Sequence, residues 1–340
     1  MNVLVTGGAG FIGSHTVVEL VNAGFSPVII DNLNNSSESV LTGLKKIIGF
    51  DVPFYKADCN DFEVVKDIIV KHKIEGIIHF AAYKAVGESV EKPIKYYKNN
   101  IGSLINILEV MQVTKVKNLV FSSSCTVYGQ PDQIPVTENT PKKKAESPYG
   151  NTKAIAEDIL EDVIKSGEQM SLISLRYFNP IGAHPSAEIG ELPNGVPSNL
   201  IPFVTQTAIG KRNKLVVFGS DYNTVDGSNV RDFIHVVDLA KAHVSALNLL
   251  KGKETAFYDV FNLGTGTGNS VLEVIKTFEE VNNLKLNYEI GPRRTGDVEK
   301  IYGDVEKASK ILNWKTEKSL KESLKDAWTW ELKLKKNNNL

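Results

Sequence analysis

Short apolar runs alternate with longer segments of helical period through the first half of the chain. The runs are rich in Val and Ile and predict strands at Val3–Thr6, Pro27–Asp31, Pro53–Ala57, Gly76–Ala82, Asn118–Ser122 and Ser171–Tyr177. The segments between them predict helices at Ile12–Ala23, Asp61–His72, Ile94–Met111 and Tyr149–Ser166. This alternation favours an α/β fold with a doubly wound, parallel sheet of the Rossmann type, whose ligands lie beyond the carboxyl ends of the strands.

The pattern changes after residue 180. Asn179–Pro202 is rich in Pro and Gly and predicts a long irregular connection, of the kind that usually has a function. The elements predicted beyond it are shorter and mixed, with strands at Leu215–Phe218 and Tyr258–Leu263 and helices at Val236–Leu250, Ser270–Asn282 and the C-terminus. We therefore expect a nucleotide-binding domain over residues 1–180. We expect a smaller mixed α/β domain that binds the substrate over most of residues 181–340. Some segments after residue 180 can return to the first domain.

Charge and composition narrow the classes of function. The 39 Lys and Arg residues balance 40 Asp and Glu residues, so no overall basic field attracts nucleic acid or an anionic membrane. No apolar run has the length of a membrane span, and the first residues lack the basic start of a signal peptide. The two cysteines, Cys59 and Cys125, are too few for a disulfide framework, and the histidines form no metal-ligand spacing. We expect a cytoplasmic protein without a metal, whose histidines are structural and whose anionic ligands meet local positive charges.

A strand, a glycine turn and the start of a helix follow one another at the N-terminus. Gly7, Gly10 and Gly13 are spaced three apart, which lets the backbone approach a pyrophosphate at the N-terminus of a helix. Asp31 ends the next predicted strand, where a carboxylate can bond both ribose hydroxyls of a dinucleotide and repel a 2′-phosphate. These features predict a dinucleotide site that prefers NAD to NADP, with a glycine turn that serves only helix packing as the alternative.

The ends of the third and fourth predicted strands add further candidates. Asp58 is placed to reach an adenine edge, or serves as a simple turn residue. Phe80, Ala81 and Lys84 follow the fourth strand on the pyrophosphate side, although Lys84 can equally be a solvated loop lysine.

Candidate catalytic groups gather at the same edge of the predicted sheet. Tyr149 and Lys153 are four residues apart and share one face of a helix. To act as a base near pH 7 a tyrosine needs a pKa about three units below its usual value of about 10, and positive charge from a lysine and a nicotinamide ring favours the phenolate. The serines 122–124 close the fifth strand, where a hydroxyl can bond a substrate oxygen. A Tyr-x-x-x-Lys pair alone is common, but its place after a glycine-rich turn and this strand favours catalysis.

Together these motifs resemble the extended short-chain dehydrogenase/reductases. The resemblance rests on Thr6–Gly13, on Ser124 with Tyr149 and Lys153, and on Arg176–Pro180. Further blocks resemble the branch of that family that acts on UDP-hexoses: His79–Ser89, Gly182–Ser186, Val230–Val236 and Pro292–Asp297. The resemblance spans nearly the whole chain. It implies an NAD-dependent isomerase that interconverts UDP-galactose and UDP-glucose, and a homodimer packed through helices Ile94–Met111 and Tyr149–Ser166.

A mechanism follows from the resemblance. Tyr149 takes the proton of the sugar 4-hydroxyl while C4 passes a hydride to bound NAD, the 4-keto sugar turns over, and the hydride returns to its other face. Ser124 orients the 4-oxygen, and Lys153 bonds the nicotinamide ribose and lowers the tyrosine pKa. NAD is then recycled within each turnover and is held as a cofactor.

The resemblance also implies two sets of binding residues. The cofactor set is Gly7, Gly10, Phe11, Ile12, Gly13, Asp31, Asn32, Asn35, Ser36, Asp58, Cys59, Phe80, Ala81, Lys84, Asn99, Ser122, Tyr149, Lys153, Tyr177 and Phe178. The substrate set is Ser124, Tyr149, Asn179, Asn199, Leu200, Leu215, Val216, Val217, Phe218, Arg231, Arg294, Asp297 and Ile301.

Three members of the substrate set have a second interpretation. Arg231 and Arg294 are candidates for the diphosphate, and the alternative is an ion pair with a neighbouring aspartate, Asp232 or Asp297. Phe218 can equally be a core residue. Ile301 has middling size at a position where the family carries a bulky tyrosine or a small residue, which leaves the acceptance of N-acetylated UDP-sugars open.

Other functions stay open from the sequence. An epimerase acting mainly on UDP-N-acetylhexosamines shares every motif. A sibling dehydratase or decarboxylase needs more acid–base groups, but residues 125–129, which follow Ser124, hold no carboxylate. A non-catalytic NAD-binding protein does not need Tyr149 and Lys153, and an ordinary dehydrogenase consumes NAD in stoichiometric amounts.

Overall fold

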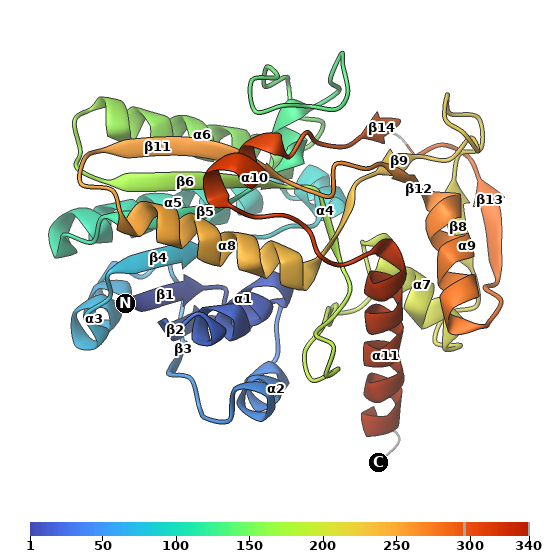
Figure 1. Cartoon of the computed structure of the whole chain (residues 1–340), viewed down its shortest axis with the longest axis horizontal. Helices are drawn as coiled ribbons and strands as arrows, with labels where there is room; N and C mark the ends of the chain where they lie inside the picture. Colours follow the sequence, from blue (N-terminus) through green and yellow to red (C-terminus); the bar gives the residue numbers. More distant parts are fainter. Residues whose placement is uncertain (295–296, 339–340) are drawn as a thin grey trace.

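Seven parallel strands form the central sheet of the computed structural model, which describes residues 1–294 and 297–338. Their order is β11-β6-β5-β4-β1-β2-β3 (Figure 1). The strands are β1 (Asn2–Thr6), β2 (Ser26–Asp31), β3 (Phe54–Lys56), β4 (Gly76–His79), β5 (Asn118–Ser124), β6 (Ser171–Tyr177) and β11 (Phe257–Leu263). The strand order reverses between β1 and β4, and a ligand crevice is expected at the carboxyl ends of these strands. The predicted Rossmann-type α/β fold is confirmed.

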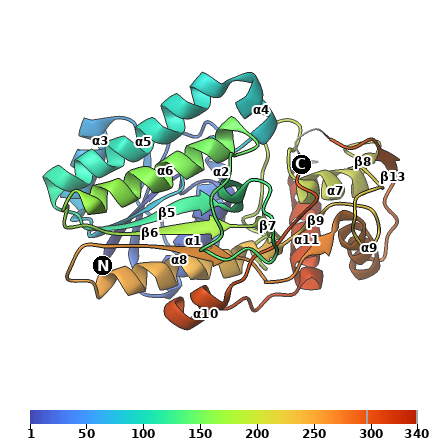
Figure 2. The same ribbon diagram turned by 90° about the horizontal axis from the view of Figure 1, so that it is seen from above.

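Helices cover both faces of this sheet (Figure 2). One face carries α1 (Phe11–Asn22), α2 (Ser39–Ile48) and α8 (Val236–Lys251), and the other carries α3 (Phe62–His72), α5 (Pro93–Thr114) and α6 (Pro148–Lys165). Alternation along β1 explains the two cores, because Val3 and Val5 pack under the first group of helices and Leu4 under the second. Within the described ranges, none of the helices has both the length and the apolar character that a membrane crossing requires.

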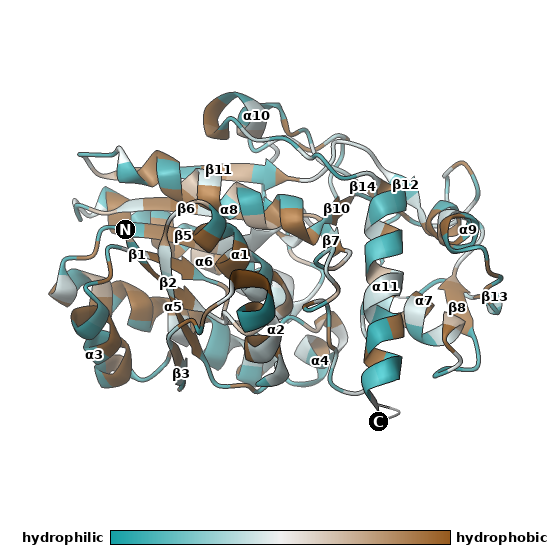
Figure 3. Ribbon diagram, turned by 60° about the horizontal axis from the view of Figure 1, so that its bottom comes forward, coloured by the Kyte–Doolittle hydropathy of each residue, from teal (hydrophilic) through white to brown (hydrophobic). Residues whose placement is uncertain are grey.

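A smaller unit lies beyond the carboxyl edge of the sheet (Figure 1). Its helices are α7 (Leu200–Ala208), α9 (Val271–Asn282) and α11 (Leu320–Asn338), which pack around Phe278. Its short strands are β7 (Asn179–Ile181) with β10 (Phe233–His235), β8 (Leu215–Phe218) with β13 (Tyr288–Gly291), and β9 (Val230–Arg231) between β12 (Asn269–Ser270) and β14 (Lys300–Ile301). Figure 3 shows α11 mostly in hydrophilic colours, and its apolar Leu324 is buried in the core of this unit.

Several elements differ from the sequence prediction. Strand β4 ends at His79 and not at Ala82, because its neighbour β1 ends opposite it at Thr6. Strand β5 continues to Ser124 because β6 pairs with it over its whole length. Helices α2 and α4 (Val86–Glu91), the short α10 (Glu306–Leu312) and the 3₁₀ turn η1 (Cys125–Tyr128) were not predicted.

Two elements from the second half of the chain belong to the first unit. Strand β11 is the seventh strand of the large sheet, paired with β6, and α8 packs against α1. Helix α10 packs against both of them.

Candidate active site

A cavity of about 200 Å³ opens at the carboxyl ends of β1, β2, β4 and β5. All members of the predicted cofactor set except Phe178 line it. Phe178 instead packs in an apolar cluster with Cys125 and Ile301. The cavity is also lined by Ser123, one of the three candidate serines, and by Asn34, Tyr83, Glu191 and Leu192, which the sequence did not single out.

The glycine turn between β1 and α1 brings bare backbone to the cavity wall. Gly7 has a φ of +68°, and a Cβ there would lie 2.9 Å from the backbone nitrogen of Ala81. A Cβ on Gly13 would lie 2.3 Å from the carbonyl oxygen of Gly7. Gly10 caps α1 without a side chain, so the first N–H groups of the helix stay available to an anion. These features fit a dinucleotide pyrophosphate.

Asp31 ends β2 with its carboxylate at the cavity. One oxygen accepts hydrogen bonds from the Leu33 backbone nitrogen (2.8 Å) and the Ser36 hydroxyl (2.9 Å), and the other accepts from the Ala9 backbone nitrogen (3.1 Å). A carboxylate fixed in this way can accept further bonds from ribose hydroxyls, which fits NAD.

For Asp58 and Lys84 of the predicted cofactor set, the sequence also offered a role outside cofactor binding. Asp58 is a turn residue, because its carboxylate accepts from the Asn60 backbone nitrogen at 2.9 Å, and it also lines the cavity, so its contact with an adenine edge stays a prediction. Lys84 lies in a loop with its side chain 44% exposed, and its ammonium lies 2.9 Å from the Glu191 carboxylate at the cavity wall.

Helix α6 presents the candidate catalytic pair to the same cavity. Ser147 caps the helix by accepting from the Gly150 backbone nitrogen at 3.2 Å, which places Tyr149 in the first turn. The ammonium of Lys153 donates to the Ser122 carbonyl oxygen (2.5 Å) and to its hydroxyl (3.2 Å), and it lies 6.0 Å from the centre of the Tyr149 ring. Helix and strand end are thereby joined at the carboxyl edge of β5.

Burial shifts the pKa values of both Tyr149 and Lys153. Burial raises the pKa of Tyr149 to about 12, against the opposing effect of a hydrogen bond with Ser124. Burial also lowers the pKa of Lys153 to about 7, and the negative charge of Glu157 acts in the other direction. The pKa of the phenol therefore moves away from neutrality, so the positive charge that would lower it must come with a ligand.

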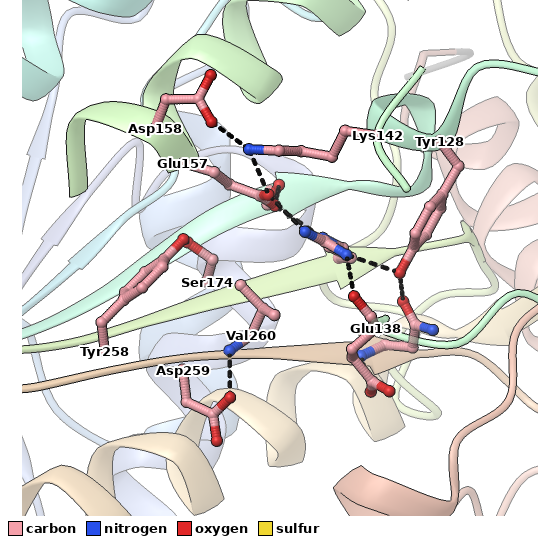
Figure 4. A network of polar contacts seen from close by, with 12 residues as sticks. Tyr128, Glu138, Lys142, Glu157, Asp158, Ser174, Tyr258, Asp259 and Val260 are labelled. Atoms are coloured by element: carbon pink, nitrogen blue, oxygen red, sulfur yellow. Dashed lines mark hydrogen bonds and ion pairs between the residues drawn. The ribbon is translucent and has the colours of Figure 1, made fainter. Parts of the chain in front are cut away.

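Behind the catalytic face of α6 lies a buried polar network (Figure 4). Glu157, one turn after the lysine, accepts from Arg176 through Nε (2.9 Å) and Nη2 (2.7 Å) and from the Ser123 hydroxyl (2.5 Å). Arg176 also donates to the Tyr128 hydroxyl at 2.9 Å, and that hydroxyl donates to Asn262 at 2.6 Å. The network ties α6 to β5, β6 and β11. Its one sequence signal is the position of Glu157 on the helix face of the catalytic pair.

The two candidate arginines lie in the smaller unit with different partners. Arg231 on β9 donates to backbone carbonyl oxygens, those of Val230 (2.9 Å) and Glu299 (3.5 Å), and burial lowers its pKa. No carboxylate in the described residues forms an ion pair with it. Arg294 pairs with Asp297 at 2.6 Å, so the ion-pair alternative applies to this arginine. Thr295 and Gly296 of the same block lie outside the described residues.

Strand β8 divides its residues between the core and the surface. The side chains of Leu215 and Val217 are buried in the apolar core of the smaller unit, so only their backbone groups are left for the predicted contact with a ligand. Phe218 is 41% exposed and is not a core residue, and the Arg294 guanidinium lies 5.7 Å from the centre of its ring. Val216 is half-buried beside it.

The remaining residues of the predicted substrate set lie on β7, at the start of α7 and on β14. Asn179 lies half-buried on β7, and Asn199 precedes α7, whose first residue, Leu200, packs against the core. Ile301 on β14 is paired in register with Arg231 on β9. Tyr149 lines the cavity and Ser124 ends β5, and the other predicted substrate residues lie in the smaller unit, apart from the residues that line the cavity.

Two residues near the site, Thr126 and His243, have surroundings that the sequence did not reveal. Thr126, in η1 just after Ser124, has a buried hydroxyl with no hydrogen-bond partner in the described parts of the chain. His243, expected to be structural, bonds through Nε2 to the hydroxyl of cavity-lining Tyr177 at 2.5 Å, and burial lowers its pKa to about 4. The residue types alone did not identify either one. The partner of His243 is distant in sequence, and the Thr126 hydroxyl has no partner in the described residues. The described residues hold no group of His, Cys, Asp or Glu side chains suited to a metal ion.

Comparison with known proteins agrees with this architecture. Residues 4–327 match the family model described as GDP-mannose 4,6 dehydratase. The chain is 50% identical over 331 residues to the UDP-glucose 4-epimerase of Bacillus subtilis, covering 97% of each protein.

Two solved structures are also close. One is a UDP-glucose 4-epimerase from Stenotrophomonas maltophila with bound NAD and formylated UDP-arabinopyranose (TM-score 0.96, 44% identity, 99% of both chains). Another is the enzyme of Bifidobacterium longum in complex with NAD⁺ and UDP (TM-score 0.94, 45% identity, 98% of both chains). The chain belongs to the extended short-chain dehydrogenase/reductases and, within them, to the UDP-glucose 4-epimerase family.

Proposed function

We propose that this protein is an isomerase that interconverts UDP-galactose and UDP-glucose with a bound NAD. The observation that carries the proposal is that Tyr149 and Lys153 line the same cavity as the glycine turn and Asp31. A phenol and an ammonium beside a dinucleotide site suit the oxidation and reduction of one carbinol carbon. Relatives of this chain that share half of its residues are UDP-glucose 4-epimerases, which favours this activity over dehydration, decarboxylation or NAD sensing.

NAD, when bound, supplies a hydride acceptor and donor for C4 of the sugar. The backbone at Gly7 and Gly10 holds the pyrophosphate at the start of α1, and Asp31 accepts from the adenosine ribose. Lys84 stands at the pyrophosphate side of the cavity. Lys153, already held by the Ser122 carbonyl oxygen, is placed to donate to a nicotinamide ribose.

The protein's own groups move and hold the proton. Tyr149 accepts the proton of the 4-hydroxyl, and returns it when the 4-keto sugar is reduced on its other face. Ser124, at the end of β5, orients the 4-oxygen. The 3₁₀ turn that follows Ser124 contributes the free hydroxyl of Thr126 and no carboxylate, so the acid–base group that a dehydratase requires is missing there.

The smaller unit and β7 hold the UDP-sugar. Arg231, which forms no ion pair in the described residues, and Arg294, whose exposed guanidinium pairs with the mostly buried Asp297, supply positive charge to the diphosphate. The exposed ring of Phe218 offers an apolar surface to the base. Asn179 and Asn199 offer side-chain amides to the sugar. We assign the substrate domain to residues 181–340 without α8, β11 and α10, which pack on the large sheet.

Conversion without added cofactor tests the proposal. The purified protein is incubated with UDP-galactose alone, and UDP-glucose is quantified by chromatography. We expect many turnovers per chain without accumulation of NADH. No conversion, even after NAD is supplied, would refute the epimerase, and formation of NADH in step with sugar oxidation would identify an ordinary dehydrogenase.

Ile301 is expected to limit the size of the accepted sugar. Its side chain is buried in one apolar cluster with Cys125, next to Ser124, and its backbone is paired with Arg231. Replacing Ile301 by Ala frees space there, so the ratio of kcat/KM for UDP-N-acetylglucosamine to that for UDP-glucose should rise about tenfold. Val136→Ala, in the same cluster, is the matched control. An equal change of the ratio in both variants would contradict a local role for Ile301.

A homodimer is part of the proposal. The outer face of α5 leaves Ile94, Ile105 and Val113 exposed by 80%, 42% and 56%, and α6 packs beside this helix. Packing of α5 and α6 against a second copy would cover these side chains. Sedimentation that finds only the mass of one chain would end this prediction. A cytoplasmic location stays a prediction that cell fractionation can test.

A further inference from the structure

The chain between β7 and α7 closes one side of the cavity. This connecting segment, residues 182–199, contributes Glu191 and Leu192 to the cavity wall. It also contacts the nucleotide-binding domain, since the Asn194 side chain donates to the Asn34 carbonyl oxygen at 3.4 Å. The segment therefore lies against the proposed cofactor from the side of the substrate domain.

Glu191 joins the two predicted ligand sets through one oxygen. Its Oε1 accepts from the Lys84 ammonium at 2.9 Å and from the Asn199 amide at 2.7 Å. Lys84 belongs to the cofactor set and Asn199 to the substrate set. The Glu191 side chain is 12% exposed and that of Lys84 is 44% exposed, so the carboxylate side of the pair is the buried one.

The backbone at Glu191 is fixed from behind by the C-terminal helix. The indole of Trp330 on α11 donates to the Glu191 carbonyl oxygen at 2.9 Å. The same ring covers Gly190, where a Cβ would lie 2.6 Å from it. The backbone of Glu191 is thereby held in place on the wall, and from there its carboxylate bonds to both donors.

We propose that Glu191 is a positioning residue that keeps Lys84 and Asn199 in place and holds the connecting segment closed over the bound dinucleotide. This rests on the proposed function. A lysine ammonium has three N–H donors, so Lys84 can keep the carboxylate while it donates to a phosphate. Without the carboxylate, its flexible side chain loses its fixed position. The Lys84–Glu191 pair joins the loop after β4 to the connecting segment, so this bond has to break if the segment moves away to release the nucleotide.

The test compares Glu191→Gln with Glu188→Gln. Glu188 lies in the same connecting segment and pairs with Lys46 of the nucleotide-binding domain (3.2 Å) and with Lys333 (2.5 Å), but it does not line the cavity. Each protein is loaded with NADH, and loss of its bound fluorescence is followed after a chase with excess NAD. We expect release about tenfold faster in Glu191→Gln and unchanged release in Glu188→Gln. The KM for UDP-galactose should rise more than kcat falls in Glu191→Gln, because Asn199 loses its acceptor.

Other outcomes overturn the proposal. Equal release rates in wild type and both variants would make Glu191 an ordinary ion-pair partner. Slower release in Glu191→Gln would mean that the carboxylate competes with the phosphate for Lys84. Equally faster release in both variants would show a general loosening of the connecting segment. NADH release is measured without turnover, so it decides the role of Glu191 even if the wild type fails to convert UDP-galactose, an outcome that refutes only the proposed function.

Discussion

Tyr149→Phe should lower kcat for UDP-galactose by about 10²–10⁴-fold, the usual contribution of a positioned acid–base group. The phenol is the titratable hydroxyl on the cavity wall next to Lys153, and without it the 4-hydroxyl proton must pass to water. NAD binding should persist, because the glycine turn and Asp31 are unchanged. Steady-state kinetics together with a cofactor titration of each protein measure the two effects.

A second tyrosine gives the matched control. Tyr97 on α5 accepts a hydrogen bond from Asn151 of α6 at 2.7 Å and does not line the cavity. Tyr97→Phe therefore loses one hydroxyl at the same helix without touching the proposed chemistry, and its kcat should stay close to that of the wild type. Substantial turnover in Tyr149→Phe would remove Tyr149 from the role of base.

Glu157→Gln should lower the free energy of unfolding by about 3–5 kcal/mol. Arg176 is 4% exposed and Glu157 2% exposed, so removal of the carboxylate leaves the guanidinium buried without its counter-charge. The expected loss is large because desolvation of the arginine is no longer offset by an ion pair with two hydrogen bonds. Equilibrium urea unfolding followed by tryptophan fluorescence measures it.

Glu161→Gln serves as the comparison on the same helix. Glu161 lies one turn further along α6 and pairs with Lys165 at 2.7 Å in solvent. An exposed pair of this kind contributes about 0.5 kcal/mol or less. If the two variants unfold at the same urea concentration, the network in Figure 4 does not anchor α6.

Features encoded by neighbouring residues were the ones that could be predicted. The strand, glycine turn and helix around Gly7 form one local unit, and so does the spacing of Tyr149 and Lys153 on a helix. The strand of residues 258–263 was also recognisable, but its partner was not. It pairs with β6, more than 80 residues earlier, and a local pattern does not identify a distant edge strand.

Features that depend on tertiary contact escaped prediction. The four residues of β8 are all apolar, so their alternation does not tell which side chains face the core and which, like Phe218, face outwards. Glu157 and Arg176 look like ordinary charged residues until the fold buries them together. The pKa of Tyr149 depends on burial, which raises it, whereas spacing alone indicated only the nearby positive charge. Glu191 was hidden in a segment without regular structure.

The central claim is that C4 of the sugar is oxidised and then reduced by the same hydride. It is tested most directly with UDP-galactose deuterated at C4, incubated with the purified protein in ordinary water without added cofactor. We predict UDP-glucose that retains the deuterium at C4, because the hydride leaves and returns within one closed site. Loss of the deuterium to solvent would contradict the account, since it would mean that C4 is inverted by proton exchange and not by hydride transfer.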